Sequence, residues 1–279
     1  MAKGKKRISE AELAVREVQK QLECNDDAYN RGLFKYLRLI VHFIAALQFC
    51  YGVYYYYFKV QHLNDETAGK SAEEVAEIAR WHWGGKFKYL TFLDAILQAG
   101  YHLLALLNDL FGSNEVAPKP EPILRRMRDY IFATLALPVA ANVCISFWTI
   151  YAYDRELIFP AELDAIFPNW LNHIVHTNVA MLIILDMFTC FRQYPSRTHG
   201  LAATLVFMLL YVVWIHIVKH FSGFWVYPLL EVLNIPMRYI MICGLVSFTV
   251  LLYFVGECLN GVIWGQELKL LKHRQFKAL

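Results

Sequence analysis

Six apolar segments, each close to the length that crosses a bilayer, constrain this chain more than any other feature. A helix needs about 20 mainly apolar residues to span the hydrocarbon core, and a spanning backbone has to satisfy its own hydrogen bonds. The sequence lacks the alternating ten-residue strands that membrane barrels need. We therefore predict an all-α polytopic membrane bundle of about six transmembrane helices. The predicted spans are residues 34–58, 89–111, 130–151, 170–190, 200–220 and 238–263.

Composition agrees with a membrane protein. The chain is 57% hydrophobic and 18% charged, whereas soluble domains average about 25% charged residues. The net charge is only +3, and the basic residues form short clusters beside apolar runs, which suits membrane orientation better than nucleic-acid binding. The six cysteines include no CxxC pair. We expect them to be small core residues rather than a disulfide framework or a metal site.

Lys and Arg residues predict the orientation of the bundle. If both termini are cytosolic, 19 of the 27 Lys and Arg residues lie on the cytosolic side or at its helix ends. We therefore expect an N-in, C-in protein with three parts. These are a cytosolic arm (1–33) that begins with basic residues and continues into a helical pattern, a six-helix transmembrane domain (34–264) and a basic cytosolic tail (265–279). The first apolar segment is expected to act as an uncleaved signal anchor in the endoplasmic reticulum or plasma membrane.

The second apolar segment carries a polar stripe. Thr91, Asp94, Gln98, His102 and Asp109 fall within about 80° of one another on a helix of about 100° per residue. Ionisable groups inside a membrane are costly and face the bundle interior or a wet cavity. This stripe is therefore expected to face inward, with Asp94 either a structural partner or part of a site.

The fourth segment begins with a second polar group. Asn172 and His176 are four residues apart and share a helix face, and His173 lies on an adjoining face. In the third segment Asn142 shares a face with two hydroxyl residues, and Pro138 should free a carbonyl and help to open a pocket. Asn142, Asn172 and His173 are thus candidates for lining a site or donating hydrogen bonds in it.

Depth makes a contact between Thr91 and His176 possible. In the N-in arrangement both helices enter from the far side, and the two residues lie within about 5 Å of each other in depth. A threonine hydroxyl is a weak nucleophile until a base takes its proton, and histidine is the usual base at neutral pH. Taken singly, each residue also fits a structural role: a hydroxyl bonded back to its helix for Thr91, and an interhelical hydrogen bond for His176.

Two other classes of function remain open from the residues alone. Several histidines lie in or near spans, so a histidine-ligated metal or haem protein is one alternative, although no HxxxH or HExxH pair occurs within these helices. The second alternative is a non-enzymatic membrane regulator, in which the polar stripes only join helices.

Six blocks, in order along the chain, carry a resemblance to a known family. They are KFKYLTFLDAILQ (86–98), SFWTIYAYDRELIFP (146–160), NWLNHIVHT (169–177), QYPSR (193–197), GFWVYPLLE (223–231) and GECLNGVIW (256–264). Together they resemble the androgen-induced-gene and androgen-dependent TFPI-regulating proteins, which are small multipass membrane hydrolases. The arm before residue 34 and the loop 59–88 are longer than is usual in that family.

The resemblance implies a membrane-embedded threonine hydrolase for fatty acid esters of hydroxy fatty acids. The family's catalytic threonine lies in the motif matched by LTFLD, which corresponds to Thr91. Its catalytic histidine is the second of the HxxHT pattern, which corresponds to His176. No metal or other cofactor is required for this chemistry. The expected partner is a lipid ester that enters sideways from the bilayer, into a cavity between the second, third and fourth helices lined by Ala95 and Ala180.

Overall fold

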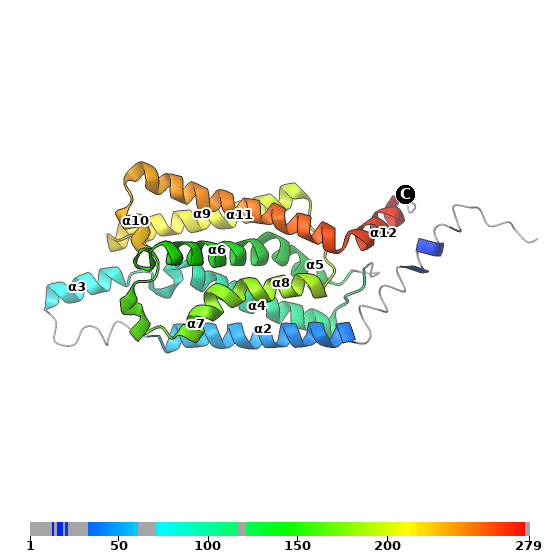
Figure 1. The fold of residues 1–279 in the computed structure, drawn as a ribbon, viewed down its shortest axis with the longest axis horizontal. Coiled ribbons are helices and arrows are strands. Elements are labelled where there is room, and N and C mark those ends of the chain that lie inside the picture. Colours follow the sequence, from blue (N-terminus) through cyan, green and yellow to red (C-terminus); the bar gives the residue numbers. More distant parts are fainter. Residues whose placement is uncertain are drawn as a thin grey trace, which may run out of the picture.

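All regular structure in the described part of the chain is helical, which confirms the predicted fold class. The computed structural model describes residues 33–60, 71–116 and 121–276, with a few positions between 13 and 21. In this part of the chain, six helices are long and apolar enough to cross a membrane (Figure 1). They are α2 (Leu33–Phe58), α4 (Leu90–Phe111), the continuous helices Ile123–Tyr153 and Asn169–Thr189, α9 (Arg197–Ser222) and α11 (Ile235–Ile263). The protein is a multi-pass membrane protein.

Two of the six helices contain a π-helical turn. The third is made of α5 (Ile123–Ile131), the π-turn η3 (Phe132–Ala136) and α6 (Leu137–Tyr153). The fourth is made of α7 (Asn169–His173), the π-turn η6 (Ile174–Asn178) and α8 (Val179–Thr189). A π-turn widens the helix locally and occurs often at functional sites, because it leaves backbone groups out of the regular ladder and redirects side chains.

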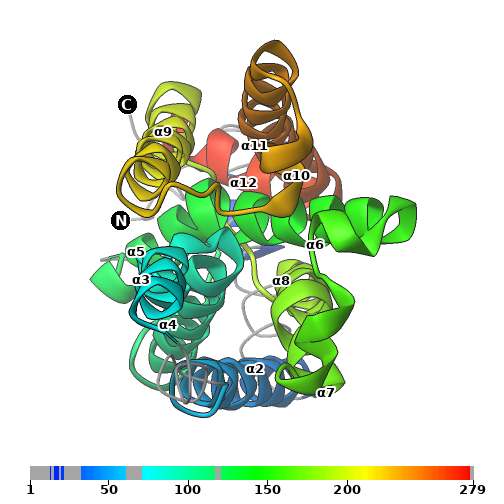
Figure 2. The same cartoon turned by 90° about the vertical axis from the view of Figure 1, so that its left-hand side faces the viewer.

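The helices form two layers that share α6. In the end view, α2, α4 and α7–α8 lie on one side of α6, and α9 and α11 lie on its other side (Figure 2). Each side has its own core. The core beside α2 and α4 includes the buried residues Phe49, Phe92, Phe132, Leu171 and Ile183. The core beside α9 and α11 includes Tyr211, Ile215, Trp225, Leu230 and Ile242.

Pro138 joins the two layers through the carbonyl that it frees. A proline has no N–H to donate to the carbonyl four residues earlier, which here is that of Thr134. The Thr204 hydroxyl of α9 donates to this carbonyl instead, over 2.7 Å. The predicted freed carbonyl therefore forms a contact between helices.

The third helix starts earlier than predicted. The third span was predicted to begin at residue 130, but the helix begins at Ile123. Arg125 and Arg128 each donate to the Asp129 carboxylate over 2.9 Å, and all three side chains are buried. Because the Asp129 carboxylate pairs with both guanidinium groups inside the protein, these charges do not end the helix.

The connections on the α3 side of the bundle contain short helices that the sequence analysis did not predict. The largest is α3 (Ala72–Trp81), in which the Ser71 hydroxyl accepts from the Glu74 N–H and the Glu74 carboxylate accepts from the Ser71 N–H. This capping box is an S-x-x-E pattern, so the signal was present in the sequence. The others are η2 (Gly85–Lys88), η4 (Arg155–Leu157), η5 (Ala161–Ala165) and α10 (Pro228–Val232).

At the carboxyl end, part of the predicted tail is the helix α12 (Gly265–Phe276). Residues 277–279 lie outside the described residues, as does almost all of the predicted N-terminal arm.

Candidate active site

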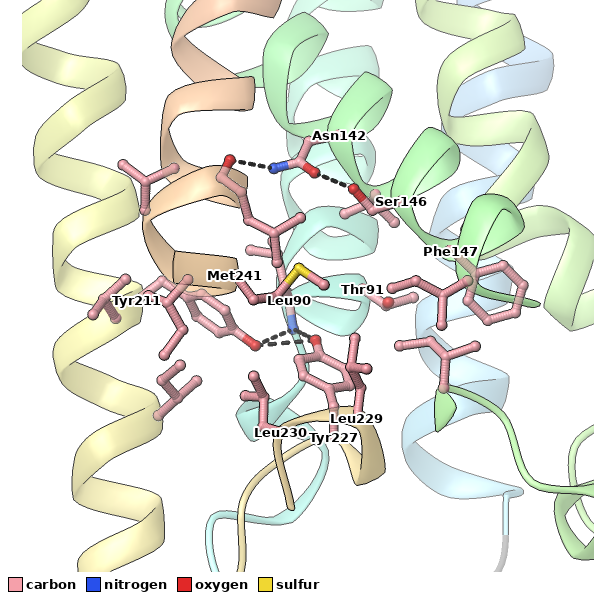
Figure 3. Close-up of a pocket in the computed structure, with 18 of the residues that line it drawn as sticks. Leu90, Thr91, Asn142, Ser146, Phe147, Tyr211, Tyr227, Leu229, Leu230 and Met241 are labelled. Carbon is pink, nitrogen blue, oxygen red and sulfur yellow. Dashed lines mark hydrogen bonds between the residues drawn. The ribbon is translucent and has the colours of Figure 1, made fainter. Parts of the chain in front are cut away.

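Two tyrosine hydroxyls hold the start of α4, where Thr91 lies. The Leu90 N–H donates to the hydroxyl oxygens of Tyr211 and Tyr227, over 3.0 Å in each case (Figure 3). The Tyr211 hydroxyl donates in turn to the Lys88 carbonyl over 3.0 Å. Tyr211 belongs to α9 and Tyr227 precedes α10. The layer that contains α9 and α11 therefore fixes the first turn of α4 and hence the position of Thr91.

His176 lies beside Thr91 and is buried in the π-turn η6. Its Nε2 is 3.2 Å from the Thr91 Oγ1. Its Nδ1 is 2.7 Å from the Asn172 Oδ1 and 3.1 Å from the Asn172 carbonyl oxygen. Both of these oxygens accept, so the Nδ1 carries the proton. The Nε2 lone pair is then directed at the Thr91 hydroxyl, which is the arrangement that a general base needs.

Phe147 of α6 fixes the plane of the His176 ring. The two rings stack with their centroids 3.5 Å apart and their planes 10° apart. Because Asn172 holds one edge of the imidazole and Phe147 covers one face, the ring has little freedom to turn away from Thr91.

An apolar cavity reaches Thr91 (Figure 3). The space within it is about 800 Å³, counting the part that opens to the outside. Its walls come from α4, α6, α9, α10 and α11. Besides Thr91 they include Asn142, Ser146, Phe147, Ile150, Ile158, Met208, Tyr211, Val212, Tyr227, Leu230, Met241, Leu245 and Val246.

The cavity does not lie where the sequence analysis placed it. It is bounded by the second, third, fifth and sixth spans, and neither Ala95 nor Ala180 lines it. Both alanines are buried in the structure, where small residues let neighbouring helices approach closely.

The structure gives the two candidate asparagines different places. Asn172 holds His176, as described above. Asn142 lines the cavity, but its amide N–H groups donate to the Thr249 hydroxyl over 2.6 Å and to the Leu245 carbonyl over 3.3 Å. Its oxygen accepts from Ser146 over 2.7 Å. Asn142 therefore joins α6 to α11 at the cavity wall.

The other two candidates do not touch the Thr91–His176 pair. His173 is exposed, its Nδ1 lies 3.1 Å from the Thr177 Oγ1, and its ring stacks on Trp148. Asp94 is fully buried, as the polar stripe predicted, and accepts from the Gln98 amide over 2.9 Å. No described histidine bonds to Asp94.

Sequence reasoning missed Tyr211, Tyr227 and Phe147. Aromatic residues inside apolar segments usually pack in the core, so nothing in their spacing distinguished these three. Tyr227 and Phe147 stood in the quoted motifs GFWVYPLLE and SFWTIYAYDRELIFP, but only as matches to the family, and Tyr211 stood in none. Their roles depend on which helices are neighbours, and helix adjacency is not encoded in the periodicity of any one helix.

A second buried polar cluster lies toward the other end of α4. Among the described residues, His42, Asp186 and Cys190 form the one group of three potential metal ligands, with ligand atoms within 4.8 Å of one another. Their polar atoms already have partners within the protein. His42 lies between Asp186 and Asp109, at 2.8 and 2.6 Å, and Asp186 also forms an ion pair with Arg192. This ion network joins α2, α4 and α8.

Comparisons with known proteins identify the family. The model of the family described as FAR-17a/AIG1-like protein matches residues 37–261. The human androgen-induced gene 1 protein is 40% identical over 191 residues, which cover 66% of this chain and 80% of that protein. The androgen-dependent TFPI-regulating protein of Mesocricetus auratus is 34% identical over 210 residues, covering 74% and 88% of the two chains.

The human androgen-dependent TFPI-regulating protein is 31% identical over 202 residues, covering 69% of this chain and 83% of that protein. No solved structure matches the chain. The family model covers all six long helices in part or in full. The chain therefore belongs to the FAR-17a/AIG1-like family of membrane proteins.

Proposed function

We propose that this protein is a membrane-embedded lipid esterase in which Thr91 is the nucleophile and His176 the general base. The observation that carries the proposal is the 3.2 Å approach of the Thr91 Oγ1 to the His176 Nε2, with the Nδ1 of the same ring held by Asn172. A nucleophile, a base within hydrogen-bonding reach and a third group that orients the base are the features shared by activated hydroxyl nucleophiles.

The first half-reaction forms an acyl-enzyme. His176 Nε2 takes the hydroxyl proton of Thr91 while the Thr91 Oγ1 attacks the ester carbonyl. The bond between that carbonyl carbon and the leaving oxygen then breaks, and His176 returns its proton to the leaving hydroxy acid. In the second half-reaction a water molecule gives its proton to His176 and attacks the acyl-threonine. The bond to Thr91 breaks, His176 returns the proton to the Thr91 oxygen, and the fatty acid leaves.

The Thr91 N–H is our candidate donor to the oxyanion. Within the described residues this N–H makes no hydrogen bond, as is usual for the first N–H groups of a helix. It lies in the first turn of α4, where the helix dipole favours negative charge. Asn142 and Asn172, the side chains considered from the sequence, are already bonded to other groups.

The shape and chemistry of the cavity support a long-chain acyl ester. Its wall is mainly apolar, and the polar residues in it are Thr91, Asn142, Ser146, Tyr211 and Tyr227. The resemblance given in the sequence analysis narrows this class to fatty acid esters of hydroxy fatty acids. Such an ester would place its acyl chain in the cavity and its carbonyl at Thr91.

The experiment is covalent labelling of the protein in nanodiscs by an alkyl fluorophosphonate, followed by peptide mass spectrometry. We expect a single adduct on Thr91 that Thr91→Ala removes and that His176→Ala slows strongly. A known membrane serine hydrolase, labelled in parallel, is the positive control. If it is labelled and wild-type Thr91 is not, the proposal is contradicted.

A further inference from the structure

The inward face of α4 continues beyond Thr91 as a row of buried polar side chains. Asp94, Gln98 and His102 follow one another at intervals of four residues, and each has 0% exposure. Residues four apart lie on the same helix face. At 1.5 Å per residue the row is about 12 Å long, and Asp94 begins it three residues after Thr91.

Four polar atoms in this row have no hydrogen-bond partner among the described residues. The Gln98 amide N–H groups donate to the Asp94 Oδ1 and to the Ala136 carbonyl, over 2.9 Å in each case. The atoms left over are the Asp94 Oδ2, the Gln98 Oε1 and both ring nitrogens of His102. Buried polar atoms in folded proteins are almost always bonded, by the protein or by ordered water.

The side chains around His102 do not supply these bonds. Phe49 stacks on its ring at 5.6 Å, and the Tyr101 ring meets it edge-on at 5.0 Å. The Tyr101 hydroxyl already donates to Asp186. The ring of His42 lies 6.0 Å away, with both of its nitrogens bonded to carboxylates.

The unbonded atoms require a ligand that both donates and accepts. Asp94 Oδ2 and Gln98 Oε1 need donors, whereas a neutral imidazole needs one donor and one acceptor. Water meets all of these needs, and a buried water usually makes about three hydrogen bonds to such groups. An anion would lie against the Asp94 carboxyl and the Gln98 oxygen, which repel it.

We propose that Asp94, Gln98 and His102 bind a row of ordered water molecules along α4, and that this row supplies the water that hydrolyses acyl-Thr91. The binding of ordered water follows from the unbonded polar atoms alone. The supply of the hydrolytic water rests on the proposed esterase function. Asp94 is a positioning residue in this scheme: its Oδ2 accepts from the water nearest to Thr91.

The cavity explains why a separate source of water is needed. Deacylation needs a water molecule beside His176 at a time when the acyl chain occupies an apolar cavity that excludes water. Thr91 borders that cavity, whereas Asp94, Gln98 and His102 do not line it. Water from the row reaches the acyl-threonine from within the layer that contains α2, α4 and α8. Its oxygen bonds to the carbonyl carbon, its proton passes to His176 and then to the Thr91 oxygen, and the Thr91–carbonyl bond breaks.

X-ray radiolytic labelling of the wild-type protein in nanodiscs tests the first half, because hydroxyl radicals form where ordered water lies. We expect Tyr101 and His102 to be oxidised faster than Met187, although all three are about equally buried and methionine is intrinsically the more reactive. His102→Phe, which removes the nitrogens and keeps an aromatic ring against Phe49, should lower the labelling of Tyr101. Labelling of Tyr101 and His102 no faster than that of Met187 would overturn the proposal.

Pre-steady-state hydrolysis by Gln98→Met tests the second half. This change keeps the side-chain length and interrupts the row. We expect it to slow decay of the acyl-enzyme about tenfold, so that the acylated protein accumulates in intact mass spectra. The rate of phosphonate labelling reports on acylation alone. If the wild-type protein is not labelled by the phosphonate, the esterase function is contradicted, whereas the radiolysis result still stands. An unchanged decay of the acyl-enzyme would contradict the delivery of water by the row.

Discussion

The Thr91 Oγ1 and the His176 Nε2 lie 3.2 Å apart although 85 residues separate them in the chain. Neither residue is placed by its own helix alone. Tyr211 and Tyr227 hold the backbone just before Thr91, so α9 and the segment before α10 set the height of the first turn of α4. Asn172 and Phe147 set the direction and the plane of the His176 ring. The pair therefore depends on contacts from both layers of helices.

Removal of the Asn172 side chain should reduce turnover without abolishing it. In Asn172→Ala the His176 Nδ1 keeps only the backbone oxygen of residue 172, which lies 3.1 Å away. We expect kcat to fall about 10- to 100-fold with little change in KM, because the loss concerns the orientation of the base. Steady-state hydrolysis of a lipid ester in nanodiscs measures both constants.

His173→Ala is the matched control for this change. His173 is on the same helix, but it is exposed and bonds to Thr177. We expect its kcat to stay within about twofold of the wild type. A larger loss in His173→Ala than in Asn172→Ala would contradict the assignment of the base and its orienting partner.

The cavity should select acyl chain length. Val246 of α11 lines the cavity, and Val246→Phe should displace about two methylene groups of a long chain. At about 0.8 kcal/mol per buried methylene, the expected cost is roughly tenfold in kcat/KM for long chains, with short chains little affected. A series of esters of increasing acyl length measures the profile.

Val255→Phe makes the same exchange on the same helix, at a residue that is 42% exposed on the outer surface of the bundle. Its acyl-length profile should match that of the wild type. The account of the cavity is wrong if both variants have the same profile, or if soluble acetate esters are the best substrates of the wild type.

A close approach of α9 to α11 should make Gly200 intolerant of a side chain. A Cβ at Gly200 would overlap the Tyr253 hydroxyl and ring, whereas a Cβ at Gly244 would meet no atom within 4 Å. Gly200→Ala should therefore destabilise the protein by about 1–3 kcal/mol. Gly244→Ala should be neutral or slightly stabilising, because alanine is the better helix former. Thermal unfolding in detergent distinguishes the two; equal midpoints would contradict the packing described here.

Both termini are predicted to lie on the cytosolic side. The prediction follows from six spans and from the excess of Lys and Arg at one end of the bundle. Tags at the two ends, tested for protease protection in sealed vesicles, should be digested together from the cytosolic face. Protection of one tag and digestion of the other is the result that an even number of spans forbids.

Several parts of this structure were predictable because they depend on one segment at a time. Span length follows from runs of apolar residues, and the inward direction of Asp94 and His102 follows from helical spacing and the cost of burying charge. The proximity of Thr91 and His176 in depth followed from counting residues below the interface. The predicted start of the third helix was wrong, because a hydropathy pattern does not show that Arg125 and Arg128 pair with Asp129.

The features that were not predicted involve several segments at once. The cavity lies against α9 and α11 because those helices pack on α6, and a sequence without known helix neighbours does not specify this. The anchoring of Leu90 by Tyr211 and Tyr227 has the same origin. By contrast, α3 was missed although its S-x-x-E capping box was present in the sequence.

The central claim is tested most directly with purified Thr91→Ala protein in nanodiscs. The measurement is its rate of hydrolysis of a fatty acid ester of a hydroxy fatty acid. If Thr91 is the nucleophile, the variant should fold as the wild type does and lose at least about 1,000-fold in kcat. Thr91→Ser should keep measurable turnover, because it retains a hydroxyl near His176. Hydrolysis by Thr91→Ala at the wild-type rate would contradict the proposed function.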